Sequence, residues 1–385
     1  MAVAADSLPV PTGPHQVGRV SLDWVDRARL DIYADNPEDR RELVVFIWYP
    51  ASPAPAAEFA PYVPRAWAPV ADFLGLNVAG LRSHAVPGAP VATDSAAYPV
   101  LLLSPSGFPP LLLSAIAEEL ASHGFVVVGV NHTYETTVTA FADGRVVQMN
   151  PAAIGGALGP QAGSHVEVFH QRAAVCEYKA ADLAFVTDQL ENLNTDPTEP
   201  FAGRLDLARA GAFGHSFGGN AALELCRTDQ RCSAAANLDG ALWSEVGRVG
   251  LDRPVLQVLA EHGEFAVTSE DAVSAGAAPN AEWFEAEKAI TFGGWRNVQR
   301  LARPGYTVQV GGAGHVSFMD VPFLPVTDAS IVKPGLDAIS IQPDRMWRIT
   351  CDLLLAFFAR HLNGSAAPLL DAPAADYPEL IVGPP

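Results

Sequence analysis

The sequence predicts an α/β fold in which a mostly parallel central sheet carries helices on both of its faces. Apolar, β-branched runs alternate with segments of helical periodicity over residues 98–362. Parallel strands that are buried on both sides are apolar along their whole length, as these runs are. With 49% hydrophobic and 17% charged residues among 385, the chain can bury a large core.

The first part of the chain is expected to contain two extended segments, at 18–33 and 42–50. The second is rich in β-branched and aromatic residues and is stopped by Pro50. Region 51–97 is rich in Pro and Ala, so we expect it to cover the surface, with a short helix near 71–76.

From residue 98 onward, strands and helices are expected to alternate. The expected strands are 98–104, 124–130, 207–214, 232–238, 254–260 and 306–310. The expected helices are 111–123, 166–193, 217–227, 282–301 and 345–362. This order is typical of a parallel sheet covered on both faces.

Three long connections, 51–97, 133–165 and 316–344, stand out between these elements. Long loops on an α/β scaffold are often lids or walls of a binding site. We therefore expect a single domain over 18–363 with lid-like insertions, preceded by an extension at 1–17. The Ala/Pro-rich tail at 364–385 is expected to be poorly ordered or draped over the surface.

Composition and charge exclude several partners. The net charge of −19 argues against nucleic acid, which requires a dense basic footprint. No apolar run approaches the length of a transmembrane helix. Residues 1–14 lack the basic and apolar stretches of a secretory signal, so we expect a cytoplasmic protein, unless the chain has been shortened at its start. The sequence does not predict the oligomeric state.

The cysteine pattern indicates neither a metal nor a redox site. No CxxC or Cys/His metal spacing is present, and no G-x-G-x-x-G or P-loop occurs, so we expect no metal and no cofactor. Cys226 and Cys232 lie six residues apart around an expected helix end. A local disulfide and two free buried thiols are both open there.

The clearest chemical signal is the segment 214–219, which reads Gly-His-Ser-Phe-Gly-Gly. It follows a strand-like run and precedes a helix-like one, which is the context of the G-x-S-x-G nucleophile turn. Cβ atoms two residues before and after the serine would clash in so tight a turn. We predict Ser216 as a nucleophile and the N–H of Phe217, at a helix N-terminus, as an oxyanion donor.

A serine nucleophile needs a base, and His315 fits that role. It follows the last expected strand and precedes the closing helix, which is where the histidine falls when the chain order is Ser, acid, His. The other histidines fit less well. His215 lies inside the nucleophile turn and would flank Ser216 without activating it, and His262 precedes another strand.

The acid that would orient His315 has more than one candidate. Asp239 follows the first strand after the nucleophile helix, whereas Glu261 or Glu264 follows the next strand. Any of them could hold the imidazole tautomer and stabilise the imidazolium. The residues alone leave the acid open.

A second oxyanion donor is expected in the loop after strand 98–104. This loop reads Pro-Ser-Gly-Phe-Pro-Pro over 105–110. Phe108 has an N–H, whereas the two prolines that follow have none, so Phe108 is the expected donor and Gly107 the second choice. Gly107 would let the backbone approach a ligand closely, and the aromatic rings of Phe108, Phe217, Trp243 and Phe318 are expected to wall an apolar substrate pocket.

Several segments resemble the platelet-activating-factor acetylhydrolase family of α/β-hydrolases, of the plasma and intracellular type II kind. They are the strand 98–104, the helix and strand at 114–127, the Gly-His-Ser-Phe-Gly-Gly turn, the Leu-Asp-Gly-Ala run at 238–241 and the histidine loop at 314–320. The resemblance is patchy over 40–360, and the long loops do not match. It implies the α/β-hydrolase fold and places the family's acid at Asp239, ahead of Glu261. In the oxyanion loop the family has a His-Gly pair where this chain has Pro-Ser-Gly-Phe, which is closer to related bacterial polyester hydrolases and cutinase-like esterases.

Triad and resemblance together predict a cofactor-free serine carboxylic-ester hydrolase that works through an acyl-enzyme. The expected substrate is a small-molecule or lipid ester with a short acyl chain on an amphipathic or phospholipid-like alcohol. A broader esterase, a lipase or a polyester or cutinase-like hydrolase with the same triad is the alternative. A catalytically silent binding module is disfavoured because nucleophile and base are both present. The acidic surplus favours neutral or zwitterionic esters.

Overall fold

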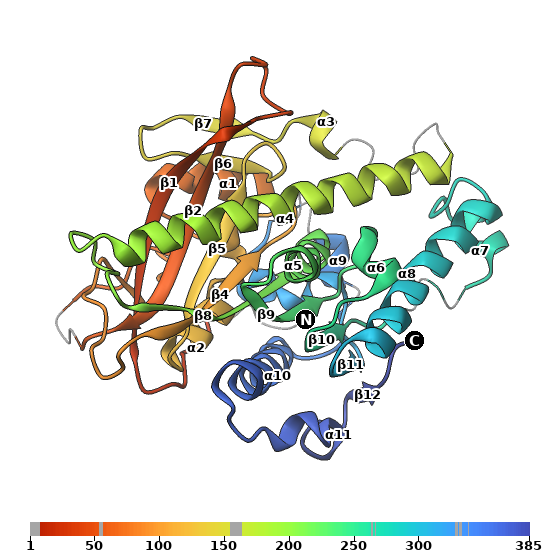
Figure 1. Ribbon diagram of the computed structural model, residues 1–385. Coiled ribbons are helices and arrows are strands. Elements are labelled where there is room, and N and C mark those ends of the chain that lie inside the picture. Colours follow the sequence, from red (N-terminus) through yellow and green to blue (C-terminus); the bar gives the residue numbers. More distant parts are fainter. Residues whose placement is uncertain are drawn as a thin grey trace.

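A mixed sheet of ten strands forms the centre of the molecule (Figure 1). The computed structural model describes residues 8–53, 57–154, 164–262, 265, 267–327, 330, 333–337 and 339–385. In chain order, the strands of this sheet are β1 (Gln16–Leu30), β2 (Arg40–Ala51), β3 (Ala85–Pro87), β4 (Tyr98–Ser104), β5 (Val126–His132), β8 (Leu205–His215), β9 (Cys232–Leu238), β10 (Val255–Leu259), β11 (Gly305–Val310) and β12 (Leu380–Val382). A separate antiparallel ribbon joins β6 (Val138–Ala140) and β7 (Val146–Gln148).

The strand order is β12-β11-β10-β9-β8-β4-β5-β2-β1-β3. All neighbours from β11 to β5 are parallel. The antiparallel pairs lie toward the two ends, where β5 meets β2, β2 meets β1, and β11 meets β12. The mostly parallel sheet predicted from the sequence is confirmed.

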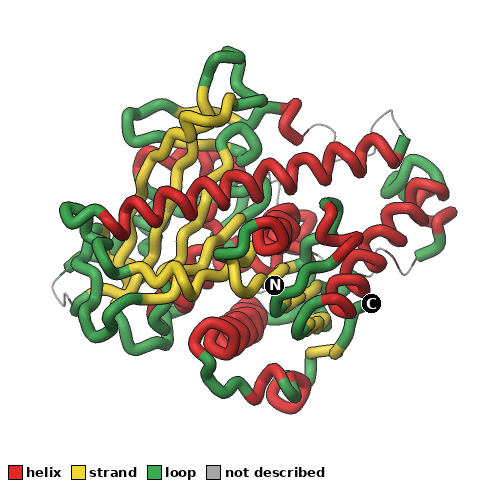
Figure 2. The backbone as a smooth tube through the Cα atoms, in the orientation of Figure 1, coloured by secondary structure: helices red, strands yellow, loops and turns green. Residues whose placement is uncertain are grey.

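Helices cover both faces of this sheet, as predicted. Those described are α1 (Ala68–Leu74), α2 (Ser114–Ser122), α3 (Pro151–Ile154), α4 (His165–Thr195), α5 (Phe217–Thr228), α6 (Glu245–Val249), α7 (Ser269–Ser274), α8 (Ala281–Leu301), α9 (Lys333–Asp337), α10 (Pro343–Asn363) and α11 (Pro373–Asp376). The long helix α4 crosses one face of the sheet beside α5 (Figure 2).

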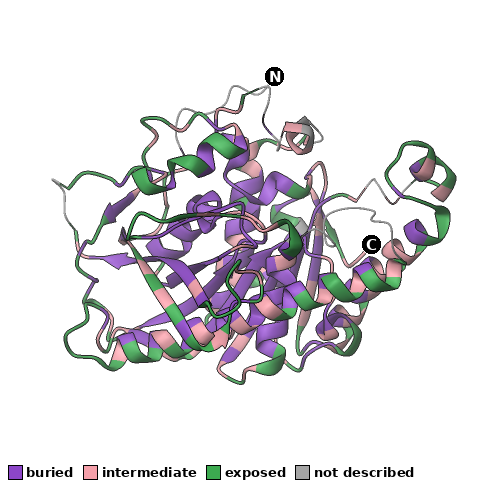
Figure 3. Cartoon of the chain, turned by 90° about the horizontal axis from the view of Figure 1, so that it is seen from above, coloured by how far each residue is buried: buried purple, intermediate pink, exposed green. Residues whose placement is uncertain are grey.

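Alternate side chains of each strand supply two separate cores. In β2, Phe46 and Trp48 pack in the core that contains α2 and α10, whereas Val45 and Ile47 pack in the core that contains α4, α5 and α8. Successive side chains of a strand point to opposite faces, so an apolar strand can bury both sides. Accordingly the strands are buried, and exposed residues gather on the outer faces of the helices (Figure 3).

Two of the expected surface connections pack against each other. Leu76 forms a β-bridge with Val326, and the N–H of Asn77 donates to the carbonyl of Pro325 at 2.9 Å. The Ser330 hydroxyl donates to the carbonyl of Leu74. Regions 51–97 and 316–344 are therefore joined in their described parts.

The described parts of both terminal regions contact the rest of the domain. Leu8 is buried, and Thr12 bonds the Glu119 carboxylate on α2 through its N–H and its hydroxyl. The tail, expected to be poorly ordered or draped over the surface, instead adds strand β12 to the edge of the sheet, where Val308 pairs with Val382. A three-residue strand is too short to stand out in an Ala/Pro-rich tail, and it forms because β11 presents an unpaired edge.

The disulfide that the sequence left open is present. Cys226, near the end of α5, and Cys232, at the start of β9, are bonded, with their Cα atoms 4.7 Å apart. Cys176 and Cys351 are buried free thiols. None of the described helices combines the length and apolarity needed to cross a bilayer.

Candidate active site

The candidate residues meet at the carboxyl ends of the parallel strands. Ser104 at the end of β4 pairs with Gly214 of β8, and His215 at the end of β8 pairs with Leu238 of β9. The segments that follow these strands therefore start side by side. Ligands of open α/β sheets bind at this edge.

Ser216 occupies the turn between β8 and α5. It has φ 57° and ψ −127°, a conformation that costs free energy for a residue with a Cβ, and it caps the N-terminus of α5. A Cβ on Gly214 or on Gly218 would clash with the carbonyl of Ser104. The glycines are thus required by the close approach of β4 to the turn, and they hold Ser216 above the edge of the sheet.

The structure brings Asp239 and His315 together. His315 follows β11 in the 3-10 helix η4 (His315–Phe318), and its Nδ1 lies 2.7 Å from Oδ2 of Asp239. Asp239 is buried at the end of β9 and also has a positive φ, of 56°. Of the rival acids, Glu261 is exposed and accepts the N–H of Gly312, and Glu264 lies outside the described residues.

A second histidine binds the same carboxylate. Nε2 of His262 lies 2.8 Å from Oδ1 of Asp239, and the N–H of Ala260 donates to that oxygen at 2.7 Å. The His262 ring packs on Trp295, with centroids 4.8 Å apart. Burial alone would raise the pKa of Asp239, but the hydrogen bonds from His262 and His315 outweigh it and hold this pKa well below its usual range. Asp239 is therefore ionised at neutral pH.

His215 supports the His315 loop from beneath. Its Nε2 lies 2.8 Å from the carbonyl of His315, and the two rings are 4.5 Å apart. Burial, and then the neighbouring His315, lower the pKa of His215 to about 3, so it is neutral and donates Nε2–H to this carbonyl. Phe318, expected in the substrate pocket, is 1% exposed and packs in the core 6.1 Å from His215. Its ring thus lies below the His315 loop, because η4 turns this side chain inward.

A cavity of about 330 Å³ lies over these groups. The nucleophile candidate Ser216, the base His315 and the acid Asp239 all line it. The other lining residues are Arg172, Phe217, Ala241, Trp243, His262, Phe265, Glu287, Thr291 and Trp295. Trp243, which the sequence analysis expects in a substrate pocket, is one of them.

A charged pair forms part of the cavity wall. An Arg172 guanidinium nitrogen lies 2.7 Å from a Glu287 carboxylate oxygen, and the guanidinium packs on the Trp243 ring at 4.5 Å. Trp243 also lines a wider groove of about 770 Å³ between α4, α6 and α8. Gly247, Gly293 and Gly294 are among the residues that line this groove.

The oxyanion-loop candidates follow β4, whose last residue touches the nucleophile turn, but they are not in the cavity lining. Ser106 has φ 69°. The carbonyl of Gly107 accepts the N–H of Thr137 at 3.0 Å, and the half-buried Phe108 packs against the core. Among the described residues that line the cavity, neither Gly107 nor Phe108 occurs.

No protein-family model matches this chain. A probable 1-alkyl-2-acetylglycerophosphocholine esterase from Arthroderma benhamiae is 27% identical over 414 aligned residues, which cover 97% of this chain and 93% of the relative. The solved structure of a ferulic acid esterase from Streptomyces cinnamoneus is 29% identical, with a TM-score of 0.76 and 99% of both chains covered.

The chain has the α/β-hydrolase fold. The curated relative supports the resemblance to the platelet-activating-factor acetylhydrolase family that the motifs indicated, and extends it to almost the whole chain. The α/β-hydrolase fold predicted from the sequence is confirmed.

Sequence reasoning missed several residues of this candidate site. His262 was set aside because another strand follows it, and His215 was treated as a neighbour of the serine. Arg172 and Glu287 come from helices far apart in the chain, and no local motif marks them. One signal was available for His262, because it follows the end of a parallel strand at the edge where sites form.

Proposed function

We propose that the protein is a serine carboxylic-ester hydrolase that works through an acyl-enzyme. The observation that carries this proposal is that Ser216 and the bonded pair Asp239–His315 line one cavity at the end of the parallel strands. The sharp turn of Ser216 at the start of α5 supports the role of nucleophile. The names of the two similar proteins, both esterases, agree with it.

In the proposed reaction, the hydroxyl of Ser216 attacks the ester carbonyl. His315 takes the hydroxyl proton on Nε2 and then donates it to the alkoxide that leaves. Asp239 keeps the other proton on Nδ1 and stabilises the imidazolium while it exists. Water then attacks the acyl-enzyme with His315 as its base, which releases the acid and restores Ser216.

The negative charge on the carbonyl oxygen needs donors that are already in place. The N–H of Phe217 is at the first position of α5, where helix amides have no intrahelical acceptor and the helix dipole favours an anion. The second donor is proposed from the loop after β4, from Phe108 or from Gly107. Each donor contributes roughly 3–4 kcal/mol to transition-state stabilisation.

The proposed substrates are short-acyl esters of amphipathic or phospholipid-like alcohols. The aromatic walls of Trp243, Phe265 and Trp295 and the modest cavity of about 330 Å³ support a short acyl chain. The name of the Arthroderma benhamiae relative agrees with this class. The net charge of −19 favours a neutral or zwitterionic ester.

The alternative is a broader esterase with the same triad, including a polyester or cutinase-like hydrolase. It is favoured by the groove of about 770 Å³ that continues past Trp243 and could take a bulky group. The ferulic acid esterase structure, similar over 99% of the chain, also favours it.

A substrate series with matched variants tests the proposal. We expect turnover of p-nitrophenyl acetate and butyrate, weaker turnover of the octanoate, and labelling of one serine by a fluorophosphonate. Ser216→Ala should abolish both, whereas Ser274→Ala, on the exposed side of α7, should leave both unchanged. Undiminished turnover by Ser216→Ala would contradict the mechanism. Faster cleavage of methyl ferulate or a polyester film than of a 2-acetyl phosphocholine ester would favour the broader esterase.

For the location, two observations point in different directions. The start of the sequence favours the cytoplasm, whereas the Cys226–Cys232 disulfide is typical of proteins from oxidising compartments. Fractionation of the source cells tests the location.

A further inference from the structure

A network of buried charges lies beneath the loop that follows β4. It contains the cations Arg29, Arg41 and Lys179 and the carboxylates Asp26, Asp31, Glu135 and Asp182. The side chains of Arg41, Glu135 and Asp182 are 0% exposed, and that of Lys179 is 2% exposed. Nothing in the sequence motifs indicated this network, because its members come from β1, β2, α4 and two loops.

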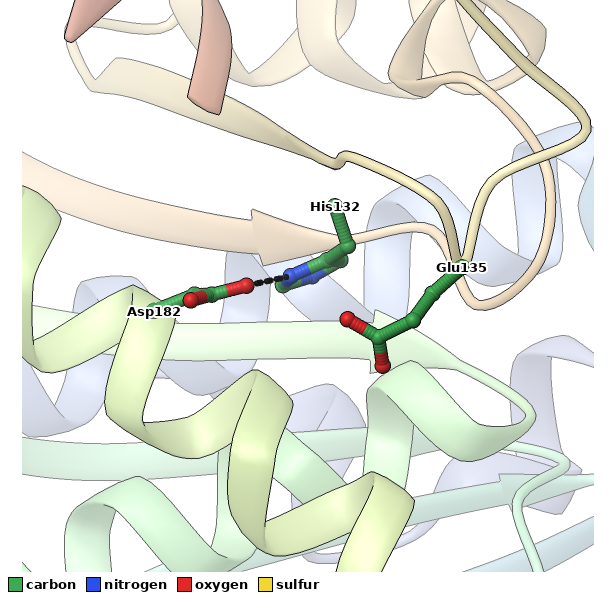
Figure 4. Close-up of side chains that lie close together, drawn as sticks. All are labelled: His132, Glu135 and Asp182. Atoms are coloured by element: carbon green, nitrogen blue, oxygen red, sulfur yellow. Dashed lines mark hydrogen bonds and ion pairs between the residues drawn. The ribbon is translucent and has the colours of Figure 1, made fainter. Parts of the chain in front are cut away.

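Two of its members, Glu135 and Asp182, have the spacing of metal ligands together with the adjoining His132 (Figure 4). A guanidinium already occupies this position. One nitrogen of Arg41 bonds both Glu135 and Asp182, and Lys179 lies 3.4 Å from the other oxygen of Glu135. The protein's own cations thus neutralise these carboxylates, so we do not infer a metal site.

Two side chains of the network region reach the loop that follows β4. The ammonium of Lys179 donates to the carbonyl of Ser106 at 3.2 Å. His132 lies between Asp182, 2.8 Å from its Nδ1, and the hydroxyl of Ser104, 2.9 Å from its Nε2. Because Nδ1 faces a carboxylate, it carries the proton, and Nε2 accepts the Ser104 hydroxyl.

These contacts orient the two peptide groups of the loop. In a trans peptide the C=O and the N–H point in opposite directions. Lys179 holds the carbonyl of Ser106, so the N–H of Gly107 points away from the network. Thr137 holds the carbonyl of Gly107, so the N–H of Phe108 points away from Thr137. The positive φ of Ser106, at 69°, is a conformation that needs such support.

The last residue of β4, from which the loop starts, touches the nucleophile turn directly. The carbonyl oxygen of Ser104 lies only 2.5 Å and 2.0 Å from the places that a Cβ of Gly214 and a Cβ of Gly218 would take. A shift of the loop would therefore displace the turn that carries Ser216, and a shift of the turn would displace the loop.

We infer that Lys179, with Glu135 as its buried counter-ion, is a positioning residue that presets the oxyanion donor of the loop after β4 before substrate binds. It orients the N–H of Gly107 through the Ser106 carbonyl, and that of Phe108 through the peptide that follows. This inference rests on the proposed esterase function. Lys179 does not touch the substrate; it acts through the Ser106 carbonyl. Preset donors raise the rate because no reorganisation is needed when charge develops on the carbonyl oxygen.

The physical state of the network fits this role. Burial lowers the pKa of Lys179, while the neighbouring Glu135 and Asp182 oppose that shift. Burial, and then the neighbouring Lys179, lower the pKa of His132 to about 3, so it stays neutral. Buried ion pairs add little net stability compared with apolar packing, so what this network adds is geometry.

The test compares Lys179→Met with Arg19→Met. Arg19, on β1 and away from the candidate active site, is a matched control. It is a buried cation that also donates to backbone carbonyls, those of Pro61 and Tyr62. We measure kcat and KM with p-nitrophenyl butyrate, thermal unfolding, and the affinities of an alkyl trifluoromethyl ketone and of butyrate. Removal of one oxyanion donor costs about 10²–10³ in kcat.

We expect Lys179→Met to lower kcat by about ten- to a hundredfold, with KM changed little, since the donors are displaced rather than removed. Affinity for the ketone, which forms a tetrahedral adduct, should fall by the same factor as kcat/KM, whereas affinity for butyrate should not. Arg19→Met should lose stability and keep kcat. Rates within threefold of wild type, or equal losses in both variants, would overturn the inference.

Glu135→Gln provides a second variant if Lys179→Met does not fold. It keeps the side-chain volume and removes the counter-ion, so a smaller loss of kcat with the same parallel loss of ketone affinity is expected. An unchanged kcat in folded Glu135→Gln contradicts the inference. A wild-type protein with neither turnover nor fluorophosphonate labelling would instead contradict the proposed function itself.

Discussion

Replacing Asp239 by asparagine should move the proton of the His315 ring from Nδ1 to Nε2 without removing a hydrogen bond. Oδ1 of Asp239 accepts the N–H of Ala260 at 2.7 Å, and a backbone N–H can only donate. The carbonyl oxygen of an asparagine must therefore take the Oδ1 position, which also suits His262. Its NH₂ group then takes the Oδ2 position, 2.7 Å from Nδ1 of His315.

The consequence for catalysis follows from this orientation. A donor opposite Nδ1 requires that Nδ1 accept, so the proton of the neutral imidazole moves to Nε2. His315 then has no lone pair toward Ser216 and cannot act as its base. A wrong tautomer of this kind lowers kcat by about 10⁴-fold in the chymotrypsin-type triad, the example from which this figure comes. At 1.36 kcal/mol per tenfold, this raises the activation free energy by about 5 kcal/mol.

The assay is kcat and KM for p-nitrophenyl butyrate, together with the rate of fluorophosphonate labelling. KM should change little, because Asp239 contacts histidines and backbone, and labelling should slow about as much as kcat. Glu261→Gln is the matched control, since its side-chain oxygen can still accept the N–H of Gly312. An Asp239→Asn variant within tenfold of wild type, or a larger loss in Glu261→Gln, would refute the assignment of the acid.

Three further predictions follow from the same structure. His262→Leu removes a charge-assisted hydrogen bond from Asp239, worth about 1.5–3 kcal/mol. We therefore expect kcat to fall at least tenfold with KM little changed. An unchanged kcat would show that His262 has no role in catalysis. Because Cys226 and Cys232 are bonded, denatured, unreduced protein should show two titratable thiols and reduced protein four. Cys226→Ser should lower the free energy of unfolding by about 2 kcal/mol. Four thiols before reduction would exclude the disulfide. Burial raises the pKa of Glu118 from 4.5 to about 7, so the folded state keeps a proton that the unfolded state releases, and stability falls as pH rises from about 4.5 to about 7. Glu118→Gln should therefore raise Tm at pH 8 relative to wild type and much less at pH 5; an equal shift at both would contradict the buried charge.

From the sequence alone, the fold class and two members of the candidate triad, Ser216 and His315, could be predicted. Strands 98–104 and 232–238 were predicted with the bounds that the structure gives them, because a strand buried on both faces is apolar throughout. The turn around Ser216 is local as well. Its glycines, its strand and its helix lie within one short segment, so the sequence shows the turn, although part of the steric demand on the glycines comes from the Ser104 carbonyl of β4.

Contacts between distant segments were beyond sequence reasoning. The residues alone left Asp239 and Glu261 equally open, and only the folded chain shows that Asp239 reaches His315 while Glu261 accepts the N–H of Gly312. Phe318 looked like a pocket residue, but the turn after β11 buries it. Local patterns cannot show on which side of a loop a side chain falls.

The sequence by itself determined the alternation of strands and helices and the Gly-x-Ser-x-Gly pattern of the Ser216 turn, because both can be seen in consecutive residues. Only the tertiary structure decided which groups surround that turn. His262 reaches Asp239, and Lys179 reaches Ser106, across 23 and 73 residues of chain. Such contacts depend on strand order and helix packing, which place residues from separate elements at one edge of the sheet.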